Sequence, residues 1–215
     1  MRLRNVKNKE QILDASSYLV KDPKSYKGRW SSLFKNNNPI YIEIGMGKGK
    51  FIIENAMKYP NINFIGIEKY DSVVCKCLVK IPEGLNNLFI VRVDALEIDE
   101  IFSSEIERIY LNFSDPWPKV RHSLRRLSSK VFLDKYDYIF KDYQSIYMRT
   151  DNRDLFIFSL ENFSEHGYIL KNISFDLHSN YEGDIITTEY EDKFSDRGMN
   201  IYSVEAYRES VQNSK

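Results

Sequence analysis

Residues 41–50 read Tyr-Ile-Glu-Ile-Gly-Met-Gly-Lys-Gly-Lys, and this stretch decides the fold class. Its apolar start predicts a strand, its three glycines predict a tight turn, and the residues that follow have helical periodicity. A glycine turn between a strand and a helix lets a ligand approach the backbone where a Cβ atom would collide with it. We therefore expect an α/β fold with a ligand site at this turn.

Short apolar runs and helical segments continue to alternate along the chain. Seven strands are expected, at 40–44, 63–67, 88–93, 109–113, 146–150, 168–174 and 200–206. Helices are expected at 48–58, 71–80, 96–105, 128–143 and 153–164. This alternation predicts a Rossmann-like, doubly wound sheet that is mostly parallel and has helices on both faces. Because no clear helix separates the last two strands, the last strand is expected to be antiparallel.

The segment before this α/β region is basic. Residues 1–29 carry eight Lys or Arg and three Asp or Glu, in a chain of zero net charge. We expect residues 1–38 to form a basic N-terminal arm with a short helix near 10–19, and residues 39–215 to form the main domain. The local excess of cations suits a protein that binds a polyanion, such as a nucleic acid, through one part of its surface only.

Cysteine content and hydropathy bear on whether the protein has disulfides, a metal site or a membrane partner, and on its expected compartment. Cys75 and Cys77 are too close in sequence for an ordinary disulfide and too few for a zinc site, so we expect buried thiols. The histidines, His122, His166 and His178, have no metal-ligand spacing, and no metal is expected. Without an apolar run of membrane-spanning length or a secretory signal, the chain is expected to be cytoplasmic and to have no membrane partner.

Three acids end three successive predicted strands: Glu43, Glu68 and Asp94. The glycine spacing has Lys50 where a dinucleotide fold has Gly or Ala, and it suits S-adenosylmethionine, which has an ammonium and a sulfonium but no pyrophosphate. Glu43 could orient the methionyl group, Glu68 could accept hydrogen bonds from both ribose hydroxyls, and Asp94, followed by Ala95, could hold the adenine amino group. Each acid could instead be a solvated strand end, but three beside one glycine turn favour a cofactor site.

A second motif follows the predicted strand at 109–113. Residues 112–119 read Asn-Phe-Ser-Asp-Pro-Trp-Pro-Lys, and five Lys or Arg with no acid occupy residues 119–130. The segment could be a rigid turn with Trp117 as an apolar lid, because proline fixes φ and Asp often begins turns. A carboxylate at Asp115 beside an indole also suits a purine base, and the cations suit its phosphates. The motif thus favours chemistry on a nucleic-acid base.

In these blocks the chain resembles the bacterial tRNA (guanine-N7-)-methyltransferases, which are class I S-adenosylmethionine-dependent enzymes. The blocks, in the order of the family, are residues 43–47, 66–68, 94–95, 112–119 with 121–122, 150–153, and 188–191 with 194 and 198. The resemblance covers about residues 40–206. It implies that the protein transfers a methyl group from S-adenosylmethionine to N7 of a guanosine at position 46, in the variable loop of tRNA.

The resemblance also implies roles for residues that match the motifs of the family. The cofactor would contact Glu43, Gly45, Gly47, Glu68, Asp94, Ala95 and Asp115, the last of which is also the implied catalytic residue. The substrate would contact Lys119, Asp151, Thr188, Glu189, Tyr190 and Glu191. Other RNA contacts would come from Arg121, His122, Ser123, Leu124, Arg125 and Arg126. Two positions depart from the family, since Leu124 stands where it often has another basic residue and Ser145 where a glycine often precedes the fifth strand.

The implied chemistry needs no general base, because guanine N7 carries an in-plane lone pair. We therefore expect Asp115 to position the reactants and to stabilise the charge that moves onto the purine. Asp151 and Glu191 could accept hydrogen bonds from guanine N1 and N2, and Trp117 could stack on the base or brace its loop. An NAD-type oxidoreductase is disfavoured by Lys50, and a catalytically silent RNA-binding subunit is the third possibility. Monomer and homodimer both remain open.

Overall fold

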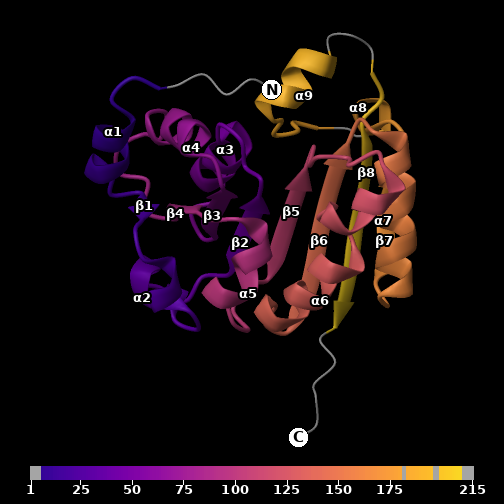
Figure 1. Cartoon of the computed structure of the whole chain (residues 1–215), viewed down its shortest axis with the longest axis horizontal. Helices are drawn as coiled ribbons and strands as arrows, with labels where there is room; N and C mark the ends of the chain where they lie inside the picture. Colours follow the sequence, from indigo (N-terminus) through magenta and orange to yellow (C-terminus); the bar gives the residue numbers. More distant parts are fainter. Residues whose placement is uncertain (1–5, 181–182, 196–198, 210–215) are drawn as a thin grey trace, which may run out of the picture.

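One eight-stranded sheet forms the centre of the molecule in the computed structural model, which describes residues 6–180, 183–195 and 199–209 (Figure 1). Its strands are β1 (Leu19–Val20), β2 (Ile40–Ile44), β3 (Asn63–Glu68), β4 (Leu88–Arg92), β5 (Arg108–Asn112), β6 (Tyr143–Thr150), β7 (Ile169–Ser174) and β8 (Tyr202–Glu209). They lie in the order β1-β4-β3-β2-β5-β6-β8-β7. The pairs from β1 to β6 are parallel, whereas β8 is antiparallel to β6 and β7. The mostly parallel sheet with an antiparallel last strand is confirmed.

The expected number of seven strands was wrong by one. The extra strand, β1, pairs in parallel with β4, and it is too short to show the alternation that marks a strand in a sequence. The same N-terminal segment adds a buried side chain, since Trp30 is fully buried and its indole Nε1 donates to the Ile101 carbonyl at 3.0 Å. The division of the chain at residue 38 stays a prediction.

Helices cover both faces of the sheet, as predicted. They are α1 (Lys9–Ala15), η1 (Pro23–Tyr26), α2 (Trp30–Phe34), α3 (Lys50–Lys58), α4 (Asp71–Leu78), η2 (Ala95–Glu97), α5 (Ile98–Ile101), η3 (Val120–Arg125), α6 (Lys130–Ile139), α7 (Arg153–Glu165), α8 (Leu177–Asn180) and α9 (Glu189–Ser195). Buried side chains of α2, α5, α6 and α7 share one core, and those of α1, α3 and α4 share the other. Cys75 and Cys77 are free, buried thiols in the second core, as expected. No helix in the described ranges is long and apolar enough to cross a membrane.

Four predicted helices end earlier in the structure, at Ala15, Leu78, Ile101 and Ile139 instead of at residues 19, 80, 105 and 143. The N-terminal helix ends at Ala15, because the residues after it approach the sheet edge as β1. The helix predicted at 128–143 ends at Ile139, because Phe140 is extended and forms a bridge with Ile106. The chain then enters β6 at Tyr143, and β6 is therefore longer than the predicted strand.

The strand order places a topological switch point between β2 and β5. From β2 the chain moves outward on one side through β3 and β4, and it then returns to β5 and continues to β6 on the other side. Ligands of doubly wound sheets bind outside the carboxyl ends of the strands at such a point. In Figure 1, α9 lies beyond the carboxyl ends of β5 and β6, at the edge of the sheet where such ligands bind.

Candidate active site

The glycine turn after β2 is tightly built. Gly45, Gly47 and Gly49 have φ of 77°, 57° and 82°, in the left-handed region that glycine occupies without strain. The backbone N–H groups of Gly45 and Met46 donate to the Ile67 carbonyl at 2.8 and 3.0 Å, which ties the turn to β3. Gly49 is the N-cap residue of α3, and a Cβ atom there would lie 2.3 Å from Cys77 Sγ.

We expect Gly49→Ala to destabilise the protein more than Gly45→Ala. Both substitutions force an L-residue into a left-handed conformation, which costs roughly 1–2 kcal/mol, but a Cβ at Gly45 meets nothing within 4 Å. The clash with Cys77 should add roughly 1–3 kcal/mol to the cost at Gly49. Urea unfolding measures both variants, and Cys77→Ala in the Gly49→Ala background should recover part of the loss. Equal destabilisation at the two glycines would contradict this packing.

Glu43, which sits at the switch point, is the most buried acid of the predicted cofactor set. Its side chain is 1% exposed, and Asn112 Nδ2 on β5 donates to its Oε1 at 2.8 Å. Within the described residues, Glu43 Oε2 and Asn112 Oδ1 are buried acceptors without a hydrogen-bond partner. Burial raises the pKa of Glu43 to about 8, and the hydrogen bond from Asn112 opposes that rise only in part.

The raised pKa predicts a particular pH dependence of folding in the absence of cofactor. Between the ordinary pKa of 4.5 and the folded value of about 8, the folded protein keeps a proton that the unfolded chain has released. The free energy of unfolding should therefore fall by up to about 1.4 kcal/mol per pH unit as pH rises through this window. In Glu43→Gln, urea unfolding between pH 5 and pH 8 should lack this contribution. An unchanged pH profile in the variant would contradict the assignment.

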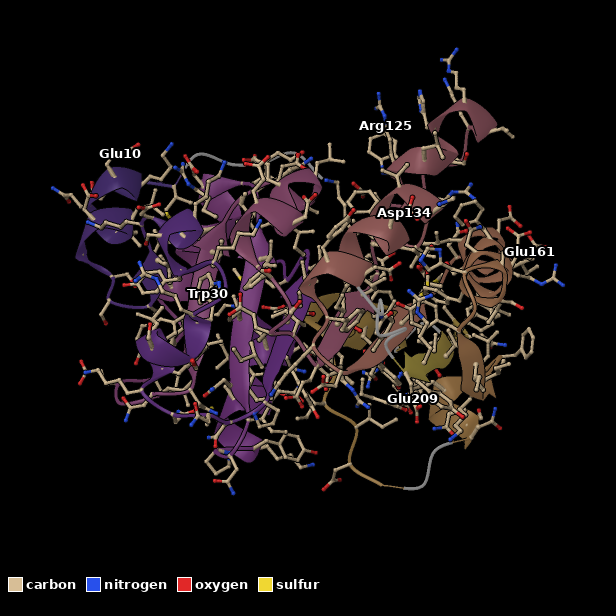
Figure 2. The ribbon with its side chains drawn as sticks, turned by 90° about the horizontal axis from the view of Figure 1, so that it is seen from below. Glu10, Trp30, Arg125, Asp134, Glu161 and Glu209 are labelled. Atoms are coloured by element: carbon tan, nitrogen blue, oxygen red, sulfur yellow. The ribbon has the colours of Figure 1, made fainter. Side chains whose placement is uncertain are left out.

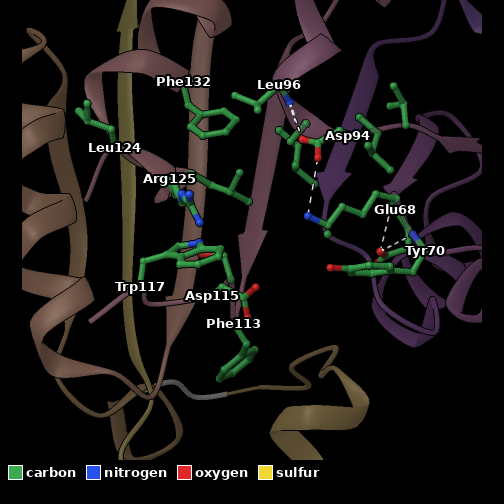
Figure 3. A pocket seen from close by; sticks show the side chains of 18 residues that line it. Glu68, Tyr70, Asp94, Leu96, Phe113, Asp115, Trp117, Leu124, Arg125 and Phe132 are labelled. Carbon is green, nitrogen blue, oxygen red and sulfur yellow. Dashed lines mark hydrogen bonds and ion pairs between the residues drawn. The ribbon is translucent and has the colours of Figure 1, made fainter. Parts of the chain in front are cut away.

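A cavity of about 560 Å³ opens beside this point, and it is lined by residues from both predicted motifs (Figure 3). Glu68 and Asp94 lie on one side of it, and Asp115 and Trp117 on the other. Its wall includes these predicted site residues: Gly45, Glu68, Asp94, Ala95, Asp115, Leu124 and Arg125. The other predicted site residues lie outside the wall: Glu43, Gly47, Lys119, Arg121, His122, Ser123, Arg126, Asp151 and residues 188–191.

Backbone donors hold Glu68 at the end of β3. Its Oε1 accepts hydrogen bonds from the N–H groups of Lys69 at 2.9 Å and Tyr70 at 3.1 Å. Burial raises the pKa of Glu68, and the backbone donors, including that of Gly47, oppose this rise. The N–H groups of Lys69 and Tyr70 both donate to Oε1, so the carboxylate keeps acceptor sites on Oε2 for a ligand in the cavity.

Asp94 is the N-terminal cap of η2. Its Oδ1 accepts from Leu96 N at 3.0 Å, and its Oδ2 lies 3.7 Å from Lys69 Nζ. The cap fixes the turn that places Ala95 and Leu96 in the wall of the cavity. Asp94 is thus both a structural cap and an acid at the rim of the cavity.

The loop that carries Asp115 has an unusual backbone. Phe113 and Trp117 have φ of 50° and 41°, which costs a non-glycine residue on the order of 1–3 kcal/mol each. Asp115 lies between these two residues in the chain; its side chain is exposed and lines the cavity. The Arg125 guanidinium lies over the Trp117 ring at 4.9 Å, and the His122 ring meets it edge-on at 5.7 Å. Arg125 therefore covers one side of the indole in this structure.

The residues predicted to contact RNA do not share one environment. Arg121, Leu124 and Arg125 are exposed, and His122 and Ser123 are partly exposed, on the η3 segment that projects from the body of the molecule (Figure 2). Lys119 is exposed and precedes η3.

Arg126, in contrast, is only 9% exposed. Its Nε donates to the Pro116 carbonyl at 2.9 Å, its Nη2 donates to the Trp117 carbonyl at 3.2 Å, and its guanidinium lies 4.3 Å from the centre of the Phe158 ring. It points into the loop that carries Asp115 instead of away from the protein.

The predicted substrate segment at 188–191 begins α9. The backbone N–H of Glu191 donates to Thr188 Oγ1 at 3.0 Å, and the backbone N–H of Thr188 lies 3.4 Å from Glu191 Oε2, which is a capping box. Glu191 is fully buried, its Oε2 lies 3.2 Å from Arg149 Nη1, and its Oε1 lies 3.1 Å from His178 Nε2. Arg149 also donates to the Ile186 carbonyl at 2.7 Å and thereby holds the segment that leads into α9.

Other contacts tie α9 to the elements around the site. Lys50 of α3 is paired with Asp192 at 2.7 Å, and Lys80 is paired with Glu189. Tyr190 donates its hydroxyl hydrogen to Asp151 Oδ2 at 2.8 Å, and its ring lies 5.0 Å from that of Phe113. Burial, together with Asp151, raises the pKa of Tyr190 to about 12. These contacts connect the glycine turn, the end of β6 and the loop after β5.

Sequence reasoning missed α9 and the basic residues that hold it, namely Lys50, Lys80 and Arg149. One signal was available, because Thr188-x-x-Glu191 has the spacing of a capping box and predicts the start of a helix. No comparable signal marks Arg149 as the partner of Glu191, since the two residues are 42 positions apart. Gly198, which contributes to the resemblance, lies outside the described residues. In the part of the chain that is described, no group of three His, Cys, Asp or Glu side chains could hold a metal ion.

Comparisons with known proteins agree with this geometry. A family model described as "Putative methyltransferase" matches residues 37–204. A tRNA (guanine-N(7)-)-methyltransferase of Lachnoclostridium phytofermentans is 51% identical over 212 residues, which make up 97% of this chain and 99% of that protein. The chain belongs to the tRNA (guanine-N(7)-)-methyltransferase family. A member of this family from Geobacillus sp. (strain WCH70) is 50% identical over 209 residues, with 95% of this chain and 94% of the relative covered.

A solved structure supports the fold independently. The crystal structure of the 16S rRNA methyltransferase KamB matches with a TM-score of 0.63 at 14% identity, over 85% of this chain and 93% of that one. At this identity the likeness concerns the fold alone. The Rossmann-like class I methyltransferase architecture and the family resemblance are therefore both confirmed.

Proposed function

We propose that the protein transfers a methyl group from S-adenosylmethionine to N7 of a guanosine in tRNA and acts in the cytoplasm. The observation that carries the proposal is the shared cavity, in which Glu68 and Asp94 lie opposite Asp115 and Trp117. A cofactor held by the first pair would present its reactive group towards the second. Relatives that carry the name of this activity, at 51% and 50% identity over nearly the whole chain, support the same reaction.

The residues around the glycine turn fit the methyl donor. Glu43 Oε2 and Asn112 Oδ1 are buried acceptors without a partner among the described residues, so an ammonium group has acceptors to meet there. Glu68 Oε2 suits the ribose hydroxyls, and Asp94 with Ala95 suits the adenine end. An ammonium beside Glu43 would favour the charged carboxylate and lower its pKa from about 8, so cofactor binding should release a proton near neutral pH.

When bound, S-adenosylmethionine supplies an electrophilic methyl group on sulfur. The N7 lone pair of guanine would form the new bond to this carbon as the carbon–sulfur bond breaks, and the sulfur would keep the electron pair. No proton is lost, so the protein does not need a general base. Asp115 holds the base in line with the methyl group and stabilises the positive charge that arrives on the purine. Such positioning can lower a barrier by roughly 7–11 kcal/mol.

Recognition of guanine is assigned to Asp151 in preference to Glu191. Glu191 is fully buried and already faces Arg149, His178 and the backbone of Thr188. Asp151 is partly exposed and binds Tyr190 through Oδ2, so its Oδ1 can accept hydrogen bonds from guanine N1 and N2. In this proposal, Glu191 holds α9 so that Tyr190 reaches Asp151. Lys119 and the exposed residues of η3, which include Arg125, contact the RNA backbone.

The test is methylation of unmodified tRNA by the purified protein, followed by borohydride reduction and aniline cleavage. Strand scission at one guanosine of the variable loop is the expected result, because the treatment cleaves at N7-methylguanosine. Calorimetry with S-adenosylmethionine and with NAD distinguishes this proposal from the oxidoreductase alternative, because a methyltransferase should bind the first compound and an oxidoreductase the second. Cofactor binding without any cleavage of the treated tRNA would instead support a catalytically silent RNA-binding protein.

A further inference from the structure

Two neighbouring arginines of the basic run point in opposite directions. Arg125 is exposed and lies over the Trp117 ring from the cavity side. Arg126 is buried, and two of its nitrogens donate to the carbonyls of Pro116 and Trp117, at 2.9 and 3.2 Å. These two carbonyls directly follow Asp115 in the chain. One guanidinium therefore fixes the backbone on the C-terminal side of the proposed catalytic carboxylate.

The loop that carries Asp115 needs contacts that hold its backbone in place. Its N-terminal end is anchored, because the backbone N–H of Phe113 donates to the Arg149 carbonyl at 2.9 Å. Both Phe113 and Trp117 have positive φ, and a strained backbone keeps its conformation only when surrounding contacts hold it there. Residues 114–118 belong to no helix or strand. The Arg126 contacts thus hold the half of the loop that the Phe113 contact leaves unsupported.

A third contact fixes the guanidinium itself. It lies 4.3 Å from the centre of the Phe158 ring on α7. Arginine stacks on aromatic faces and presents several donors in a rigid plane, whereas lysine has one compact ammonium. Because the stack fixes the plane of the guanidinium, its donors keep their directions towards the two carbonyls.

We propose that Arg126 is a positioning residue that holds Asp115 at the reacting centre through the carbonyls of Pro116 and Trp117. The proposal rests on the proposed function, in which Asp115 acts on the bound guanine. It separates Arg126 from the other basic residues of the segment. Arg125 contacts the RNA, whereas Arg126 acts within the protein.

The experiment compares Arg126→Ala and Arg126→Lys with Arg125→Ala, which removes the same charge from the adjacent position. Steady-state methylation gives kcat and KM for tRNA and for S-adenosylmethionine, and filter binding at several salt concentrations gives the salt dependence of tRNA affinity. Arg126→Ala should lower kcat by about 100-fold, the effect expected when a reacting group moves by about 1 Å, and should change both KM values by less than about threefold. The logarithmic salt slope should stay as in the wild type for Arg126→Ala and decrease by about 0.7–0.9 for Arg125→Ala.

Two further measurements distinguish positioning from loss of folding. Arg126→Lys keeps the charge and most of the volume, yet its single ammonium cannot reproduce the two directed hydrogen bonds, so its kcat should also fall by more than tenfold. Guanidinium chloride at tens of millimolar should restore part of kcat in Arg126→Ala, whereas sodium chloride at equal ionic strength should not. Circular dichroism sets an assay temperature at which all variants are folded.

Several results would overturn the proposal. Wild-type kcat in folded Arg126→Lys, or a reduced salt slope with unchanged kcat in Arg126→Ala, would make Arg126 an RNA contact. A loss confined to KM would have the same consequence. Failure of the proposed function itself is distinguishable, because the wild-type protein would then leave tRNA unmethylated in the same assay.

Discussion

Asp115→Ala should lower kcat for N7 methylation by roughly 100- to 1000-fold, while the affinity for S-adenosylmethionine falls by a smaller factor. Asp115 is exposed to the cavity, and the loop around it is held at both ends, so its carboxylate keeps a defined place beside the reacting base. Losing one preorganised electrostatic contact in a transition state typically has an effect of this size. Single-turnover methylation measures the chemical step, and calorimetry measures cofactor affinity.

Asp115→Asn tests the nature of the contribution. Asparagine keeps the shape and one oxygen acceptor but has no charge, so a large loss in this variant would assign the effect to stabilisation of positive charge on the purine. Near wild-type turnover in Asp115→Asn, combined with loss in Asp115→Ala, would instead assign it to positioning by a hydrogen bond. Near wild-type turnover in both variants would contradict the catalytic assignment.

Glu68→Ala should weaken binding of S-adenosylmethionine by about 100-fold or more. The carboxylate is fixed by two backbone donors on Oε1, which leaves Oε2 to accept from the ribose hydroxyls. Hydrogen bonds to a charged group contribute on the order of 1.5–3 kcal/mol each, and two of them account for this change. Calorimetric titration measures the dissociation constant.

Glu83→Ala is a matched control for this prediction, because Glu83 is an exposed acid outside the wall of the cavity. It should bind the cofactor as the wild type does. If Glu68→Ala also retained wild-type affinity, the ribose would have to bind elsewhere. Glu68→Gln refines the result, because it keeps the length of the side chain and removes only the charge.

The part of the site that could be predicted from the sequence follows from the geometry of parallel sheets. Parallel strands bring their carboxyl ends to one edge of the sheet, so acids at or just after the ends of β3, β4 and β5 must lie near one another. This is why Glu68, Asp94 and Asp115 line one cavity although 47 positions separate the first from the last. The bounds of β2, β3, β4 and β5 could be predicted within one residue for a related reason, since buried parallel strands appear as continuous apolar runs.

Other features of the site depend on the directions of side chains and on contacts between residues far apart in the chain. Neither leaves a periodic pattern in the sequence. Arg125 and Arg126 are identical in type and adjacent, yet a short 3₁₀ segment turns one outward and buries the other. Glu191 is buried because Arg149, on another element, balances its charge. A sequence pattern indicates which residue types are present in such a segment, but side-chain directions there depend on packing. The roles of the individual site residues therefore remain predictions for experiment.

The insertion of β8 between β6 and β7 has a consequence for the order in which the sheet can form. β8 follows both strands in the chain, and it is the strand that joins them in the finished sheet. Asp151 directly follows β6, and α9 lies in the chain between β7 and β8. The strands that carry the cofactor residues can therefore pair without β8, whereas the guanine side is complete only when β8 has paired with both neighbours. A folding chain can thus acquire its site for the methyl donor before its site for the base.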